Sequence, residues 1–227
     1  MRSSKTLKNK TAVEAVLIDL DEVLIFGDKV EIVERLFATT TSLSLKIGKR
    51  QLREICEQNN CIIDMISEII KDENVSREEF EKAKEIFEGK FDSLLSLGDG
   101  VTETLDYLRE LGVPLAIVSS RTSSAIPRIL KKMEIIIYFD VIVGREECRD
   151  KKPSSEPIEY ALRQLEISSK ENVYMIGDRQ SIDIQSAINA GVGSILVNKK
   201  LDKQGALPTL QIEKFKDLRS LKIFQKL

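Results

Sequence analysis

The sequence predicts an α/β fold, in which a mainly parallel sheet is covered by helices on both faces. A small all-helical domain is expected as an insertion after the first strand. Three observations lead to this prediction. An apolar run of strand length lies near the N-terminus, similar runs alternate with amphipathic stretches in the second half, and the intervening segment has helical spacing. Strands that alternate with helices form right-handed βαβ units, whose strands are parallel.

The first strand is expected at residues 13–18, where an apolar, β-branched run ends abruptly in Asp19 and Asp21. Such a run is typical of a buried strand in a parallel sheet. Further strands are expected at residues 114–118, 139–143, 173–176 and 194–197. Helices are expected at residues 101–111, 156–165 and 182–190. The first and last of these helices are followed by Gly112 and Gly191, which are typical of helix ends.

The segment from about residue 28 to residue 97 interrupts this alternation. Its apolar side chains fall mostly at helical spacing and predict no strand, and residues 76–79 (Ser-Arg-Glu-Glu) form a capping box that begins a helix at Ser76. We therefore expect residues 1–27 and 98–227 to form the α/β core and residues 28–97 to form a helical cap domain. An insertion at this place overhangs the carboxyl edge of the sheet and can act as a lid. A packed subdomain without a gating role fits the same pattern.

The composition excludes several classes of function. The net charge of −2 and the pI of about 5.6 argue against a nucleic-acid partner, which would require a basic surface. No apolar run approaches membrane-spanning length, and the N-terminus lacks a signal-peptide core. Three cysteines without metal-type spacing indicate reduced thiols in a cytoplasmic protein. The absence of histidine excludes mechanisms that need an imidazole base or ligand, including Ser-His-Asp hydrolysis.

Polar and charged residues follow the ends of four of the expected strands. They are Asp19 and Asp21, Ser119 and Ser120, Lys152, Asp178 after Gly177, and Asp183 at the start of the next helix. Each of these alone is more often part of a turn or a helix cap. Their common position matters, because ligands of open α/β sheets bind outside the carboxyl ends of the strands.

The charges of these residues indicate a cation and a phosphate. Asp19, Asp21, Asp178 and Asp183 would place four carboxylates in one crevice, where their mutual repulsion requires neutralisation. Lys152 supplies one positive charge, and an oxygen-bound divalent ion such as Mg²⁺ can supply the rest. Such a site suits a phosphate, which cations neutralise and which hydroxyl and N–H groups can hold.

In these residues the chain resembles the haloacid dehalogenase superfamily, in the group with a helical cap that includes phosphoglycolate phosphatase and β-phosphoglucomutase. Residues 19–23 (Asp-Leu-Asp-Glu-Val) are similar to the first motif of the family, and Ser119 matches the second motif. Lys152 with Pro153 is similar to the third motif, although Ser155 replaces a usual proline. Residues 177–191, which begin with Gly-Asp, are similar to the fourth. The resemblance covers about residues 13–200 and implies a Rossmann-like core.

The resemblance also implies a role for each of these residues. Asp19 would be the nucleophile that forms an aspartyl-phosphate, and Asp21 would protonate the leaving oxygen and then activate water. Ser119, together with Ser120, would bind phosphoryl oxygens, and Lys152 would hold Asp19 and the phosphoryl group together. Mg²⁺ would be bound by Asp19, the main-chain carbonyl of Asp21 and Asp178, with Asp183 nearby. Because dehalogenases lack an acid at the position of Asp21, phosphoryl transfer is favoured over dehalogenation.

The sequence therefore predicts a Mg²⁺-dependent phosphatase, a phosphoric monoester hydrolase that acts on a small phosphorylated metabolite and has neither a nucleic-acid nor a membrane partner. One alternative is a phosphosugar mutase of the β-phosphoglucomutase type, which would release little free phosphate. Another is a non-catalytic module that binds a phosphorylated ligand or a protein. Glu22 departs from the family pattern, since many cap-bearing relatives have glycine there. Neither the particular substrate nor the oligomeric state can be read from the sequence.

Overall fold

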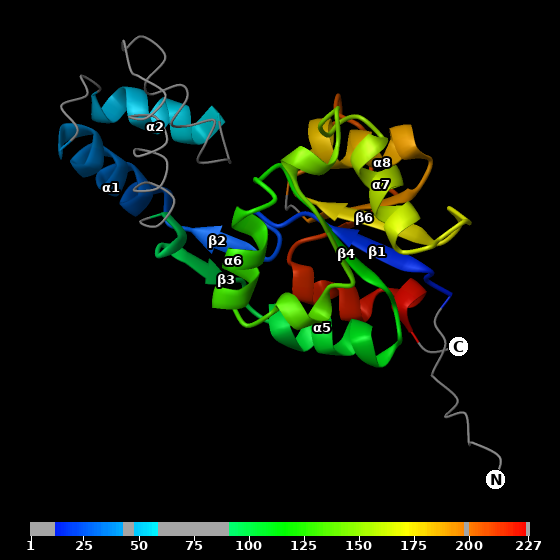
Figure 1. Ribbon diagram of the computed structural model, residues 1–227. Coiled ribbons are helices and arrows are strands. Elements are labelled where there is room, and N and C mark those ends of the chain that lie inside the picture. The colour runs from blue at the N-terminus through cyan, green and yellow to red at the C-terminus, as the bar shows by residue number, and fades with distance from the viewer. Residues whose placement is uncertain (1–11, 43–47, 59–90, 198–199, 226–227) are drawn as a thin grey trace. The chain divides into compact units, whose positions relative to one another are not determined.

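The computed structural model describes residues 12–42, 48–58, 91–197 and 200–225 (Figure 1). The predicted helix start at Ser76 lies outside these residues. The chain divides into two compact units, one formed by Met1–Leu24 together with Leu97–Leu227 and the other by Ile25–Ser96. In the described part of the chain, no helix is both long and apolar enough to cross a membrane.

The first unit is built on a parallel sheet, which confirms the predicted fold class. Its described strands are β1 (Ala15–Ile18), β4 (Leu115–Val118), β5 (Val141–Val143), β6 (Val173–Gly177), β7 (Gly193–Val197) and β8 (Leu210–Ile212). They are arranged in the order β5-β4-β1-β6-β7-β8, and every neighbouring pair is parallel. All four residues of β1 are buried, because this strand lies inside the sheet and both of its faces are covered.

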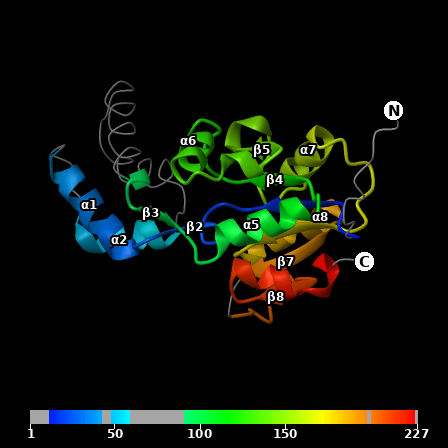
Figure 2. The same ribbon diagram turned by 90° about the horizontal axis from the view of Figure 1, so that it is seen from below.

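Helices cover both faces of this sheet (Figures 1 and 2). The helices are α5 (Val101–Glu110), α6 (Ala125–Lys132), α7 (Glu156–Gln164) and α8 (Gln185–Ala190), with short 3₁₀ helices that include η4 (Phe215–Ser220). In Figure 1, α7 and α8 lie on one face, and α5 and η4 lie on the other. Leu17, Val118 and Met175 form part of a hydrophobic core together with Ile158 of α7 and Ala187 of α8.

The order of the strands explains where the functional residues gather. After β1 the chain builds β4 and β5 on one side of it and then crosses to build β6, β7 and β8 on the other. The last residue of β1, Ile18, pairs with Ile117 of β4 and with Ile176 of β6. The residues that follow these three strands therefore meet at one edge, at the point where the order of the strands reverses.

The second unit contains α1 (Lys29–Ser42), α2 (Lys49–Gln58) and a two-stranded sheet of β2 (Ile25–Gly27) and β3 (Leu95–Leu97). Helix α1 begins where the Asp28 carboxylate accepts hydrogen bonds from the N–H groups of Val30 and Glu31, at 2.8 and 3.1 Å. Strand β3 lies in the segment for which no strand was expected. Each of these two strands is three residues long and has a single fully buried residue, so neither gives a readable alternation.

Three elements of the first unit also differ from the sequence-based expectation. Helix α6 was not predicted; it has Pro127 in its first turn, where proline is tolerated. Strand β8 is a three-residue strand at the end of the sheet order. The helix expected at residues 182–190 begins as a π-helical turn, η3 (Gln180–Ile184), and continues as α8.

Candidate active site

Three carboxylates meet at the carboxyl edge of the sheet. Asp19 follows β1, Asp178 follows β6, and Asp183 lies in η3. Each offers a carboxylate oxygen, and these oxygens lie within 4.8 Å of one another. Asp19 and Asp183 are buried, so bulk water does not solvate their charges, and they require a neighbouring cation.

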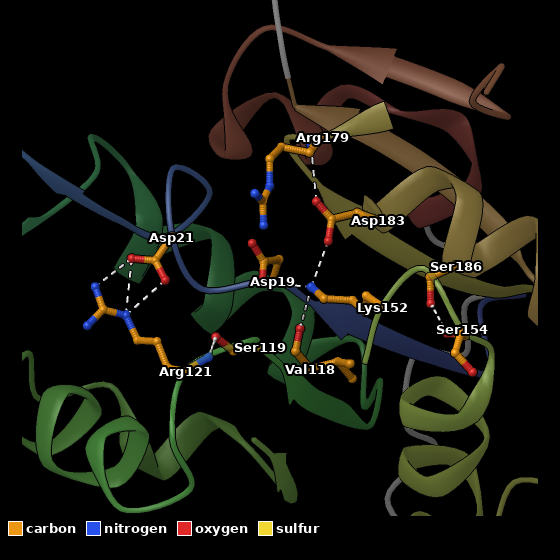
Figure 3. A network of polar contacts seen from close by, with 10 residues as sticks. All are labelled: Asp19, Asp21, Val118, Ser119, Arg121, Lys152, Ser154, Arg179, Asp183 and Ser186. Carbon is orange, nitrogen blue, oxygen red and sulfur yellow. Dashed lines mark hydrogen bonds and ion pairs between the residues drawn. The ribbon is translucent and has the colours of Figure 1, made fainter. Parts of the chain in front are cut away.

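The ammonium group of Lys152 lies between two of these carboxylates (Figure 3). Its Nζ donates hydrogen bonds to Asp19 Oδ1 at 2.8 Å, to Asp183 Oδ1 at 2.6 Å and to the carbonyl oxygen of Val118 at 2.9 Å. An ammonium group has three hydrogens to donate, so these three contacts satisfy it. Because the side chain is only 2% exposed, Lys152 is a fixed positive charge that joins the ends of β1 and β4 to η3.

Asp183 is held in place by the turn that follows β6. Its Oδ2 accepts a hydrogen bond from the N–H of Arg179 at 3.0 Å, and its own N–H donates to the carbonyl oxygen of Arg179 at 2.8 Å. Gly177 makes this turn possible, because a Cβ at that position would lie 2.2 Å from the Cβ of Asp183. Glycine at position 177 therefore allows the backbone to approach the side chain of Asp183 closely.

Burial raises the pKa values of two of these carboxyl groups, those of Asp178 and Asp19. Burial raises the pKa of Asp178 to about 8, and the charges of Asp19 and Asp183 act in the same direction. Burial raises the pKa of Asp19 to about 6, against the opposing effect of Lys152. Burial disfavours the charge of Lys152, but Asp183 and Asp19 outweigh this effect and raise its pKa. A cation bound among the three carboxylates would lower the raised pKa values of Asp19 and Asp178, so these residues fit a metal ion.

The fourth carboxylate predicted for this crevice, that of Asp21, pairs instead with Arg121 (Figure 3). Arg121 donates from Nε to Asp21 Oδ2 at 2.8 Å and from a terminal nitrogen to Oδ1 at 2.6 Å. The charge of Asp21 still raises the pKa of Asp19, so Asp21 lies near the other three carboxylates, and Arg121 adds a positive charge that the sequence did not predict. The metal contact expected of Asp21 concerned its main-chain carbonyl and stays a prediction.

Ser119 and Ser120 begin the loop that follows β4. Ser119 is buried, and its Oγ accepts a hydrogen bond from the N–H of Arg121 at 3.2 Å. This contact uses a lone pair of the hydroxyl oxygen and not its hydrogen, so Ser119 can donate that hydrogen to an anion. The carbonyl oxygen of Ser120 accepts a hydrogen bond from Nε of Arg145 at 3.1 Å.

Sequence reasoning missed two cationic residues near the site. Arg121 follows Ser119 by two residues, and Arg179 follows Asp178 directly. The side chain of Arg179 extends from the turn toward Asp19 (Figure 3), and its charge lowers the pKa of Asp178. The sequence could have indicated both arginines, because each lies within two residues of a residue that matches a family motif. The described residues thus place three cationic side chains near four carboxylates.

Comparison with known proteins agrees with this arrangement. The model of the haloacid dehalogenase-like hydrolase family matches residues 16–197. The chain is 32% identical to pyrophosphatase PpaX of Halalkalibacterium halodurans over 187 residues, which cover 82% of this chain and 83% of that protein. It is 30% identical over 95 residues to phosphoglycolate phosphatase of Escherichia coli K12, covering 42% of this chain and 37% of the relative.

A solved structure of similar fold is that of CbbY from Rhodobacter sphaeroides in complex with phosphate. The TM-score is 0.71 at 19% sequence identity, and the match covers 91% of this chain and 96% of that one. The predicted phosphatase class is confirmed by the names of the sequence relatives. On the family match and on this similarity to its members, the chain belongs to the haloacid dehalogenase-like hydrolases.

Proposed function

We propose that the chain is a Mg²⁺-dependent phosphatase that hydrolyses a small phosphorylated metabolite through an aspartyl-phosphate on Asp19. The observation that carries this proposal is the position of Lys152, whose Nζ lies 2.8 Å from Asp19 Oδ1 and 2.6 Å from Asp183 Oδ1. A buried ammonium group at the nucleophile can hold a phosphoryl oxygen against the carboxylate that attacks it. A purely structural ion pair would not require Asp178 and Ser119 at the same edge of the sheet.

The reaction would proceed in two steps. The carboxylate of Asp19 attacks phosphorus, the bond from phosphorus to the leaving oxygen breaks, and Asp21 gives a proton to that oxygen. Asp21 then takes a proton from a water molecule whose oxygen attacks the phosphorus of the aspartyl-phosphate. Free phosphate leaves, and Asp19 regains its carboxylate. Ser119 and the N–H of Ser120 would donate hydrogen bonds to the phosphoryl oxygens during both steps.

The carboxylates of Asp19, Asp178 and Asp183 are suited to hold the metal, together with the main-chain carbonyl of Asp21. Three clustered carboxylates, with raised pKa values for Asp19 and Asp178 and with no sulfur or imidazole in the cluster, favour a hard cation such as Mg²⁺. Bound there, Mg²⁺ would supply positive charge to the phosphoryl group. Lys152 adds a positive charge that does not depend on the ion.

The substrate is proposed as a class. Pyrophosphate and phosphoglycolate deserve first testing, because sequence relatives carry the names pyrophosphatase and phosphoglycolate phosphatase. We also propose that residues 28–97 act as a cap that selects the substrate and that the enzyme works in the cytoplasm. The measurement is release of free phosphate across a panel of phosphorylated metabolites in the presence of Mg²⁺. A mutase would release little phosphate while interconverting sugar phosphates.

The decisive variant is Asp19→Asn, which removes the nucleophile and changes the side chain by one atom. We expect a loss of turnover of at least about 10³-fold with an unchanged circular dichroism spectrum. The matched control is Asp99→Asn, because Asp99 is an exposed carboxylate that pairs with Lys216. EDTA should abolish activity and Mg²⁺ should restore it. Near-normal hydrolysis by Asp19→Asn, or unchanged activity in EDTA, would refute the mechanism.

A further inference from the structure

Arg121 makes contacts with three separate parts of the first unit. Its guanidinium group binds both oxygens of Asp21, which follows β1. Its N–H donates to Oγ of Ser119, at the end of β4. Its carbonyl oxygen accepts a hydrogen bond of 2.8 Å from the N–H of Arg145, in the segment that follows β5. One residue thus connects the acid-base candidate, the phosphate-binding hydroxyl and the neighbouring loop.

Arg121 is the more deeply buried member of the Arg121–Asp21 ion pair. The side chain of Arg121 is 3% exposed, whereas that of Asp21 is 16% exposed. A guanidinium group that contacts both oxygens of a carboxylate fixes the plane of that carboxylate as well as its distance. A lysine would act as a point charge and would fix the distance alone. The orientation of the Asp21 carboxylate is therefore set by this arginine.

The loop that carries Arg121 is also anchored without the arginine side chain. Ser123 donates a backbone hydrogen bond of 2.6 Å to Glu146, and its hydroxyl contacts both Glu146 and Glu147. Gly144 packs so closely that a Cβ there would lie 2.8 Å from the Cα of Ser123. Replacing the side chain of Arg121 should therefore leave the loop in place and change mainly the orientation of Asp21.

We propose that Arg121 is a positioning residue whose guanidinium group orients Asp21 for proton transfer. This inference rests on the proposed phosphatase function, in which Asp21 protonates the leaving oxygen. Proton transfer by a positioned side chain contributes about 10²–10⁴-fold to a rate. The contribution depends on the leaving group, because a weakly basic leaving oxygen departs without a proton and a strongly basic one does not.

The experiment compares aryl phosphates of increasing leaving-group basicity, from p-nitrophenyl to phenyl phosphate, with Mg²⁺ present. In Arg121→Met we expect kcat for phenyl phosphate to fall about 100-fold, and kcat for p-nitrophenyl phosphate to fall less than about tenfold. Arg121→Lys keeps the positive charge but cannot contact both carboxylate oxygens with a planar group, so its kcat for phenyl phosphate should lie between those of the wild type and Arg121→Met. An equal loss for every aryl phosphate, or no loss for any, would overturn the proposal.

The matched control is Arg109→Met. Arg109 also contacts both oxygens of an aspartate, Asp140, at 3.0 and 2.8 Å, but Asp140 precedes β5 and so lies at the opposite end of the strands. This variant should keep the dependence of the wild-type enzyme on the leaving group. A steeper dependence in Arg109→Met would mean that general loosening of the fold explains the effect, which would also overturn the proposal.

A second measurement needs no turnover. Thermal unfolding midpoints of Asp21→Asn, Arg121→Met and the double variant form a cycle that isolates the coupling between the two side chains. We expect the double variant to lose clearly less than the sum of the single losses, whereas additive losses would overturn the positioning role. If the wild-type enzyme hydrolysed no phosphate compound, the proposed function would fail by itself, and the unfolding cycle would still decide whether Arg121 holds Asp21.

Discussion

Replacing Lys152 by methionine tests the electrostatic account of the site. The substitution keeps the length of the side chain and removes a charge that makes three hydrogen bonds, two of them to carboxylates. Asp19 and Asp183 would then lie buried without their cation. Removing one partner of a buried ion pair costs about 3–5 kcal/mol of unfolding free energy. In a chain of this size, that loss corresponds to a decrease of roughly 6–20 °C in Tm.

The assay is thermal unfolding in EDTA at pH 7, followed by circular dichroism, with Lys216→Met as the control. Lys216 also pairs with an aspartate, Asp99, but that pair is exposed, so its loss should leave the Tm almost unchanged. A loss of less than about 1 kcal/mol in Lys152→Met, the range of exposed pairs, would refute the reasoning. It would mean that the carboxylates do not depend on this lysine.

Two further predictions concern pH and the backbone. Burial raises the pKa of Asp178 to about 8 and that of Asp19 to about 6. The metal-free folded state therefore binds more protons than the unfolded state at pH values from about 4, where an aspartate titrates in the unfolded chain, up to these raised pKa values. Stability in EDTA should therefore fall as the pH rises from 5 to 8, and the increase in Tm that Mg²⁺ produces should be larger at pH 8 than at pH 6; a pH-independent increase would contradict this. Glu22 has a φ of 57°, in the left-handed region, so Glu22→Gly should stabilise the protein by about 0.5–1 kcal/mol in urea unfolding, after the entropy of glycine is subtracted. Glu166→Gly, at a φ of 58° after α7, should give a similar gain, and a loss in both variants would show that the strain argument is wrong.

The backbone conformation of Glu22 gives a physical reason for the glycine that the family pattern has at this position. Glycine adopts a left-handed conformation without strain, whereas glutamate does so at a cost. The sequence alone could locate the difference but could not show that the position requires this conformation. The positive φ at Glu22 is a conformation that glycine adopts without strain, which fits the glycine of the family pattern.

Much of the fold could be predicted because its main strands are buried on both faces. Runs such as residues 114–118 and 173–176 are nearly continuous apolar segments, and the structure has strands at Leu115–Val118 and Val173–Gly177. Strands β2, β3 and β8 could not be found in this way. Each has only three residues, which is too short for a pattern of buried and exposed positions to be recognised in the sequence.

The motif residues predicted which side chains would meet, but not how their charges pair. Asp19, Asp178, Asp183 and Lys152 come together because parallel strands end at a common edge. Residues two apart share a face of a strand, so Asp19 and Asp21 would point the same way if β1 continued through both of them. In the structure β1 ends at Ile18, so the side chain of Asp21 follows the course of the loop toward Arg121. Strand alternation could not predict that direction.

The position of β1 has a consequence for synthesis of the protein. This strand is synthesised before both of its neighbours in the sheet, since Val16 pairs with Leu115 on one side and with Tyr174 on the other. The apolar segment of β1 therefore cannot pair in the sheet until both β4 and β6 have been synthesised. Contacts between such distant residues also form slowly, because of the entropy of loop closure. Asp19 and Lys152 are 133 residues apart. A nascent chain consequently contains Asp19 early but cannot bring it together with Lys152 and Asp183 until the segment that carries them has left the ribosome.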